Sequence, residues 1–165
     1  MAIAEYLDKT YPETPQVIPH NTLALQTAFA DGFLANFRAI FDIITLLTTS
    51  KLNPRSEEYY RRTREKWFGK KMEEMAPKGE AAIAQWSRFK DGVGKVDAWY
   101  AKNGGKGPFL LGEAPSWGDI VVASFLVFLR IVWGEDSPEW KDVSSWHNGR
   151  WAGIVEALKK YETVV

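Results

Sequence analysis

Apolar residues recur three and four positions apart through most of this 165-residue chain, and that spacing is the period of an α-helix. The clearest stretch places a phenylalanine on each of four successive turns, at Phe29, Phe33, Phe37 and Phe41. Strict alternation of apolar and polar residues, which would indicate a β-strand, is almost absent. The sequence therefore predicts an all-α bundle.

Prolines and glycines divide this pattern, because proline fixes φ and lacks an amide hydrogen, while glycine commonly ends a helix. We predict helices over residues 2–11, 21–50, 55–68, 80–103, 120–133, 137–146 and 148–161. Asn53 is expected to cap the third helix and Gly69 to end it, and Asn21 or Thr22 is expected to cap the second. Two internal glycines, Gly92 and Gly94, disfavour a continuous helix over residues 80–103.

Residues 12–19 hold three prolines, which predicts an extended connector. A connector so near the start of the chain joins the main domain to something very small or to something missing. We therefore divide the chain into residues 1–19, a short helix with its linker, and residues 20–165, the main helical domain.

The charge balance excludes several classes of partner. Lys plus Arg and Asp plus Glu number 21 each, so the chain has no net field to attract nucleic acid or an anionic membrane. The apolar run 120–133 is too short to span a bilayer and contains Arg130. There is no cysteine, which removes disulfides and thiolate chemistry. We expect a cytoplasmic protein that binds neither nucleic acid nor membrane.

No set of side chains predicts a catalytic or metal centre. His20 and His147 lie far apart and are expected to be surface or structural residues. The acidic neighbours, such as Glu57 and Glu58, would point in different directions on a helix. The glycine-rich segment 104–107 lacks a preceding strand and is interpreted as a simple loop. The basic run at Arg61, Arg62, Arg64 and Lys66 is balanced by nearby glutamates, which predicts a salt-bridged helix face.

The sharpest local pattern is Ser116-Trp117-Gly118-Asp119, directly before the most apolar helix. Ser116 at the cap and Asp119 three residues later fit a capping box, in which each side chain satisfies the other's backbone amide. Such a cap stabilises a buried helix by about 1–2 kcal/mol. We interpret the pair as a folding device.

Together with residues 109–112 (Phe-Leu-Leu-Gly), this capping box resembles the helical C-terminal domain of glutathione transferases. Residues 2–12 resemble the last helix of that family's thioredoxin-like first domain and the start of the interdomain linker. Residues 53–70 and 146–151 are similar to a fungal, basidiomycete-type branch related to bacterial β-etherases. The resemblance covers essentially the whole chain.

The resemblance implies that most of the first domain is missing. In the family that domain supplies the thiol-activating residue, a cis-proline and an acid-serine pair, and none of these matches a residue of this chain. We therefore expect no catalytic residue and no cofactor here, with glutathione a co-substrate only if a complete first domain is supplied. Whether the shortened front end is natural, engineered or a cleavage product stays open.

The phenylalanine ridge has two interpretations. It either packs in the core or partly lines a cleft for an apolar ligand. The resemblance favours the cleft, because the family's acceptor site lies between the first domain and the start of this long helix. Asp31 would add a polar contact to such a cleft, whose predicted lining is Phe29, Phe33, Asn36, Phe37, Ile40, Trp133 and Trp140.

Three functions remain open. The chain is the apolar-substrate half of a glutathione transferase-like protein, a non-catalytic binder of hydrophobic small molecules such as phenolics or terpenoids, or a protein-interaction module that forms a homodimer.

Overall fold

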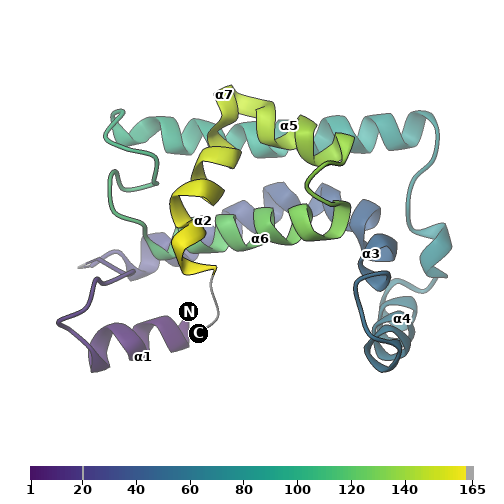
Figure 1. Ribbon diagram of the computed structural model, residues 1–165, viewed down its shortest axis with the longest axis horizontal. Helices are drawn as coiled ribbons and strands as arrows, with labels where there is room; N and C mark the ends of the chain where they lie inside the picture. Colours follow the sequence, from purple (N-terminus) through teal and green to yellow (C-terminus); the bar gives the residue numbers. More distant parts are fainter. Residues whose placement is uncertain (20, 163–165) are drawn as a thin grey trace.

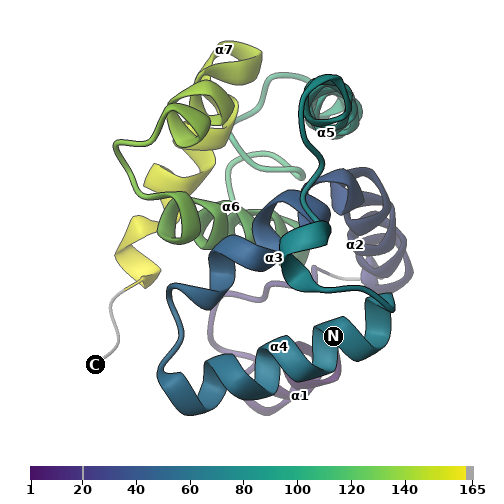
Figure 2. The ribbon, with the colours of Figure 1, turned by 90° about the vertical axis from the view of Figure 1, so that its right-hand side faces the viewer.

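The computed structural model describes residues 1–19 and 21–162, so the prediction for His20 lies outside the described residues (Figures 1 and 2). Within those ranges the chain is helical and contains no strand, only an isolated bridge between Phe109 and Gly112. The predicted all-α class is confirmed. The α-helices are α1 (Ala2–Thr10), α2 (Leu23–Phe37), α3 (Phe41–Thr49), α4 (Pro54–Phe68), α5 (Glu80–Tyr100), α6 (Trp117–Trp133) and α7 (Pro138–Leu158).

The bundle is built around α6, which packs against α2, α3 and α7, while α5 packs against α2 and α7. Figure 1 shows α5 along the top, with α2 and α6 running below it. Helices α1 and α4 lie at opposite ends of the lower side. The shared core holds large side chains from α2, α3, α5, α6 and α7, among them Phe37, Phe89, Leu126, Val143 and Trp151, whereas α4 has no buried residue.

The predicted helix over 21–50 is present as one continuous helical run with a tighter 3₁₀ turn at Arg38–Ile40 between α2 and α3. Its predicted side-chain cap is absent, because the Thr22 hydroxyl donates to the Pro19 carbonyl oxygen at 2.6 Å. The run Leu23–Thr49 has a mean hydropathy of 1.3 over an 18-residue window, so its length and composition alone would allow it to cross a membrane. In this structure it supplies the core residues Phe37 and Ile44.

Helices α4 and α5 follow the predicted boundaries closely. Asn53 caps α4 by accepting a hydrogen bond from the Ser56 amide at 2.9 Å, and Gly69 ends the helix with φ 68°. Helix α5 runs unbroken through Gly92 and Gly94 and ends in a 3₁₀ turn at Ala101–Asn103. Gly92 is needed because a β-carbon there would lie 2.1 Å from the Asn36 carbonyl oxygen on α2.

The last two predicted helices are the halves of α7. Between them Trp146 is extended, and His147, Asn148 and Gly149 adopt the left-handed conformation with φ of 53°, 58° and 77°. A 3₁₀ turn at Lys159–Tyr161 follows.

Helix α1 is held to the body by its linker. The two carboxylate oxygens of Asp8 accept from the amides of Val17 and Ile18 at 3.3 and 2.8 Å, and the Val17 carbonyl accepts from the Trp117 amide at 2.7 Å. Residues 12–19 were predicted to be an extended connector; they form neither helix nor strand, but the segment begins with a turn, in which the Thr14 amide donates to the Tyr11 carbonyl oxygen at 3.1 Å.

Candidate functional site

Several buried hydrogen bonds meet at the N-terminus of α6. Both contacts of the predicted capping box between Ser116 and Asp119 are present. The fully buried Asp119 carboxylate also accepts from the Tyr100 hydroxyl at 2.9 Å and from the Leu110 amide at 2.8 Å. Burial, together with the Asp119 charge, raises the pKa of Tyr100 far above its usual range. The phenol therefore stays protonated and acts as a donor.

Sequence reasoning missed Gln26 as a member of this group. Gln26 lies on α2, is almost completely buried, and accepts from the Gly118 amide at 2.8 Å. Gly118 leaves no room for a side chain, because a β-carbon there would lie 2.7 Å from a ring carbon of Phe29. The only available signal was a glutamine within an apolar helical pattern, which points to burial but names no partner.

The phenylalanine ridge lies mainly in the core. Phe33, Phe37 and Ile40 are buried, with ring centroids 4.9 Å apart for Phe33 and Phe37. Phe29 is partly buried against Trp99. The Asn36 amide donates to its own helix at the Gly32 carbonyl, and Asp31 is exposed. Of the α2 residues predicted to contact a ligand, only Phe29, Asn36 and Asp31 therefore have accessible side chains.

The two tryptophans of the predicted cleft lie at the other end of the bundle. Trp140 is buried in the core, and Trp133 packs against Trp86 with ring centroids 5.7 Å apart. The Trp133 indole nitrogen is buried and has no hydrogen-bond acceptor among the described residues. Sequence reasoning missed Asp142, whose carboxylate accepts from the indole nitrogens of Trp86 and Trp146 at 2.9 and 3.0 Å.

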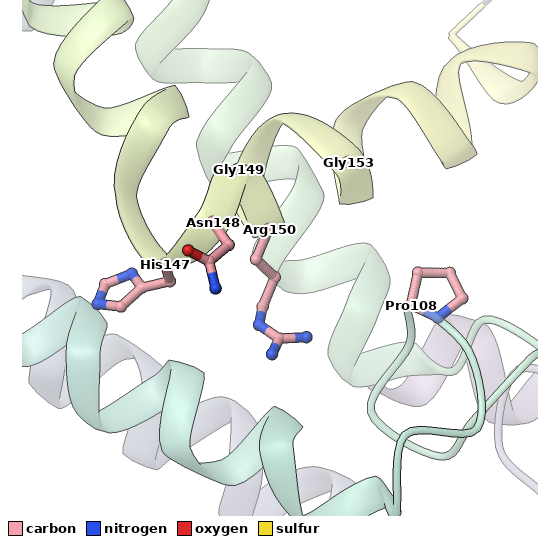
Figure 3. A pocket seen from close by; sticks show the side chains of 6 residues that line it. All are labelled: Pro108, His147, Asn148, Gly149, Arg150 and Gly153. Carbon is pink, nitrogen blue, oxygen red and sulfur yellow. The ribbon is translucent and has the colours of Figure 1, made fainter.

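An open pocket lies where α7 is broken (Figure 3). Its volume is about 340 Å³, and it is lined by Pro108, His147, Asn148, Gly149, Arg150 and Gly153. In Figure 3 the side chains of Asn148 and Arg150 extend from α7 toward α5, and Pro108 lies across from them on the loop before α6. We call this space the α7 pocket.

Arg150 is fixed at the α7 pocket by two contacts. Its Nε donates to Asp97 on α5, and its guanidinium lies over the Tyr100 ring, 5.7 Å from the centroid. His147 is fixed as well, because its Nδ1 accepts from the Trp151 indole nitrogen at 2.9 Å. His147 is thus the satisfied structural residue that the sequence predicted, although its place beside a pocket was not foreseen.

The remaining side chains singled out in the sequence lie in loops and on the helix surface. Among the described residues no cluster of three or more potential ligands is placed to hold a metal ion. Residues 104–107 form a loop. In the basic run, Arg61 contacts Glu57, Glu65 and Glu73, while Arg62 and Arg64 lie over the rings of Tyr59 and Tyr60. The salt-bridged face is therefore centred on Arg61.

Comparison with solved structures gives close matches to fungal proteins. A glutathione S-transferase of Ceriporiopsis subvermispora in complex with glutathione superposes with a TM-score of 0.93 at 42% identity, over 99% of this chain and 66% of that one. A glutathione transferase of Phanerochaete chrysosporium gives a TM-score of 0.89 at 36% identity, over 99% and 64%.

Sequence comparisons give the same family as the solved structures. A glutathione S-transferase-like protein of Aspergillus flavus is 30% identical over 166 residues, which is 95% of this chain and 58% of that protein. This chain thus spans less than two thirds of the relatives it matches. The family model for the glutathione S-transferase C-terminal domain matches residues 24–161. The chain therefore belongs to the glutathione S-transferase family and carries its C-terminal helical domain.

Proposed function

We propose that this chain is the part of a glutathione transferase-like protein that binds the apolar substrate, while a further domain binds glutathione and activates its thiol. The relatives support this division, because this chain leaves at least a third of the length of each of them unmatched. One of those relatives was solved in complex with glutathione. The catalytic step itself is assigned to no residue of this chain.

The observation that carries the proposal is the bare apolar face of α1. This face consists of three large side chains whose exposed fractions are high: Ile3 at 77%, Tyr6 at 64% and Leu7 at 46%. Within α1 only Ala4 is buried. An amphipathic helix gains most of its stability by packing that face, so three large exposed side chains favour a further layer of structure on this side. By the resemblance, that layer is the thioredoxin-like domain.

The apolar ligand is proposed to contact the accessible parts of Phe29 and Asn36 on α2, close to where α1 joins the body. Phe33, Phe37 and Ile40 support this surface from within the core and do not themselves offer area to a ligand. An apolar surface with a few polar groups suits an oxygen-bearing hydrophobic molecule such as a phenolic. The ligand site and a cytoplasmic location are both part of the proposal.

The same observation favours a second candidate, a homodimer. Two copies of the 165-residue chain would each hide Ile3, Tyr6 and Leu7 by packing their α1 faces together. In that case α1 marks an assembly surface, and the apolar contacts are satisfied without any further domain.

Two measurements on the 165-residue chain separate these functions. With glutathione and 1-chloro-2,4-dinitrobenzene we expect no turnover above the uncatalysed rate. With anilinonaphthalene sulfonate we expect fluorescence enhancement that phenolics reduce.

The variant Leu7→Lys tests whether the exposed face of α1 is an assembly surface. Its matched control is Leu111→Lys, at another exposed leucine. Turnover by this chain alone would defeat the proposed division of labour. A dimer that dissociates in Leu7→Lys and binds no dye would favour the second candidate.

A further inference from the structure

We propose that the α7 pocket binds a small molecule through a carboxylate or phosphate group, separately from the apolar surface on α2. Three of the side chains that line it, those of His147, Asn148 and Arg150, carry hydrogen-bond donors, and no acidic side chain is among the lining residues. Two paired oxygens match the planar donor geometry of a guanidinium.

Arg150 is held so that its terminal nitrogens stay available. Asp97 occupies only Nε, and no hydrogen bond within the described residues involves the two terminal nitrogens of Arg150. The Tyr100 ring supports the guanidinium by a cation–π contact. Because Asp97 offsets the charge of Arg150, recognition depends on the geometry of the donors more than on net charge. We therefore expect a ligand affinity in the millimolar range.

The backbone of the pocket leaves the helical conformation at the break in α7. His147 and Asn148 are left-handed at φ 53° and 58°, a conformation that costs most residues roughly 1–2 kcal/mol, asparagine less, and glycine almost nothing. His147 is retained by its hydrogen bond with Trp151. Asn148 is exposed, and its side chain makes no hydrogen bond within the described residues. Strain of this kind is concentrated at binding sites, and it places the Asn148 amide beside Arg150.

The opposite wall is fixed before any ligand binds. The Asn103 side-chain amide donates to the carbonyl oxygens of Gly107 and Phe109, at 3.1 and 2.7 Å, and these residues flank Pro108. Gly107 also lies so close to the following turn that a β-carbon would be 2.7 Å from the Gly112 carbonyl oxygen. At Gly153, by contrast, a β-carbon would meet nothing within 4 Å, so the pocket stays open. A pre-formed pocket loses little entropy on binding.

The test is an NMR titration of the 165-residue chain with phenyl phosphate, benzoate and neutral benzyl alcohol. The signals followed are those of the Arg150 Nε–H and the Asn148 side-chain amide. We expect saturable shifts with at least one of the two anions and none with benzyl alcohol. A response to phenyl phosphate alone identifies a phosphate-bearing ligand, a response to benzoate alone identifies a carboxylate, and a response to both supports the shared anion chemistry.

Three variants make the titration decisive. Arg150→Gln should weaken anion binding about tenfold or more. Arg130→Gln, which removes the same charge from the ion pair with Glu162 on another part of the bundle, should leave binding unchanged. Asn148→Gly should weaken binding several-fold while the melting temperature stays equal or rises, because glycine relieves the left-handed strain. Equal binding in Arg150→Gln, no saturable shift with either anion, or an equal response to benzyl alcohol would overturn the proposal.

Discussion

The Tyr100 hydroxyl donates a 2.9 Å hydrogen bond to the Asp119 carboxylate, which ties the end of α5 to the start of α6. The same carboxylate accepts from the Leu110 amide and from both the amide and the hydroxyl of Ser116. Asp119 is fully buried, so water cannot replace these bonds. A helix cap that is local in the sequence therefore also joins two helices and a loop.

Asp119→Ala should lower the free energy of unfolding by about 3–5 kcal/mol, because each buried donor left without an acceptor costs about 1–3 kcal/mol. Tyr100→Phe removes one of these bonds and should cost about 1–2 kcal/mol. Urea unfolding followed by tryptophan fluorescence measures both. The control is Asp136→Ala, at an exposed carboxylate 3.6 Å from Lys141, which should change stability by less than about 0.5 kcal/mol. Equal, small losses for Asp119→Ala and Asp136→Ala would show that Asp119 does not hold this corner together.

Gly92→Ala should destabilise the chain by about 3 kcal/mol, because the added β-carbon would meet the Asn36 backbone on α2 and force two packed helices apart. Gly153 is the matched control, since it is also helical and a β-carbon there meets nothing within 4 Å. Gly153→Ala should therefore raise stability by about 0.5–1 kcal/mol through the loss of glycine's unfolded-state entropy. Thermal unfolding of the two variants should give shifts of opposite sign. A shift of the same sign would mean that α2 and α5 do not approach as closely as described.

Local patterns predicted the helices well, because caps and breakers act within a few residues. Asn53 and Gly69 bound α4 as expected, and the Ser116–Asp119 pair formed its capping box. The predicted cap at Thr22 is an exception, because its hydroxyl donates to the Pro19 carbonyl oxygen and does not cap α2. The continuity of α5 could not be read from its glycines, since Gly92 is explained only by contact with α2.

The pocket was much harder to predict, because it depends on contacts between residues far apart in the sequence. Arg150 meets Asp97 across 53 positions, and Gln26 meets Gly118 across 92. Helical spacing identifies the inner face of α2 but gives the same pattern for a core ridge and for a cleft. The seven residues proposed for one cleft are accordingly spread along the bundle, with Phe29 beside Trp99 and Trp133 beside Trp86.

The pKa of Glu65 is held below its ordinary value of 4.5, chiefly by the hydrogen bond from Lys71, whose Nζ lies 2.8 Å from the carboxylate. The backbone amide of Met72 and the charge of Arg61 act in the same direction. A carboxyl whose pKa is lowered by folding stabilises the folded state above 4.5. That stabilisation is lost as the pH falls below 4.5 through the folded pKa. We therefore expect the corner between α4 and the turn at Met72–Glu74 to loosen in acid.

A carbon-13 NMR titration of the Glu65 carboxyl measures this directly, and its midpoint should lie below 4.5. Lys71→Met removes the main cause and should move the midpoint up toward 4.5, while amide exchange in residues 65–75 becomes faster at neutral pH. Lys78→Met takes the same charge from an exposed lysine that forms no salt bridge within the described residues, and should leave the Glu65 midpoint in place. If both lysine variants moved the midpoint equally, long-range charge and not the Lys71 contact would set the titration.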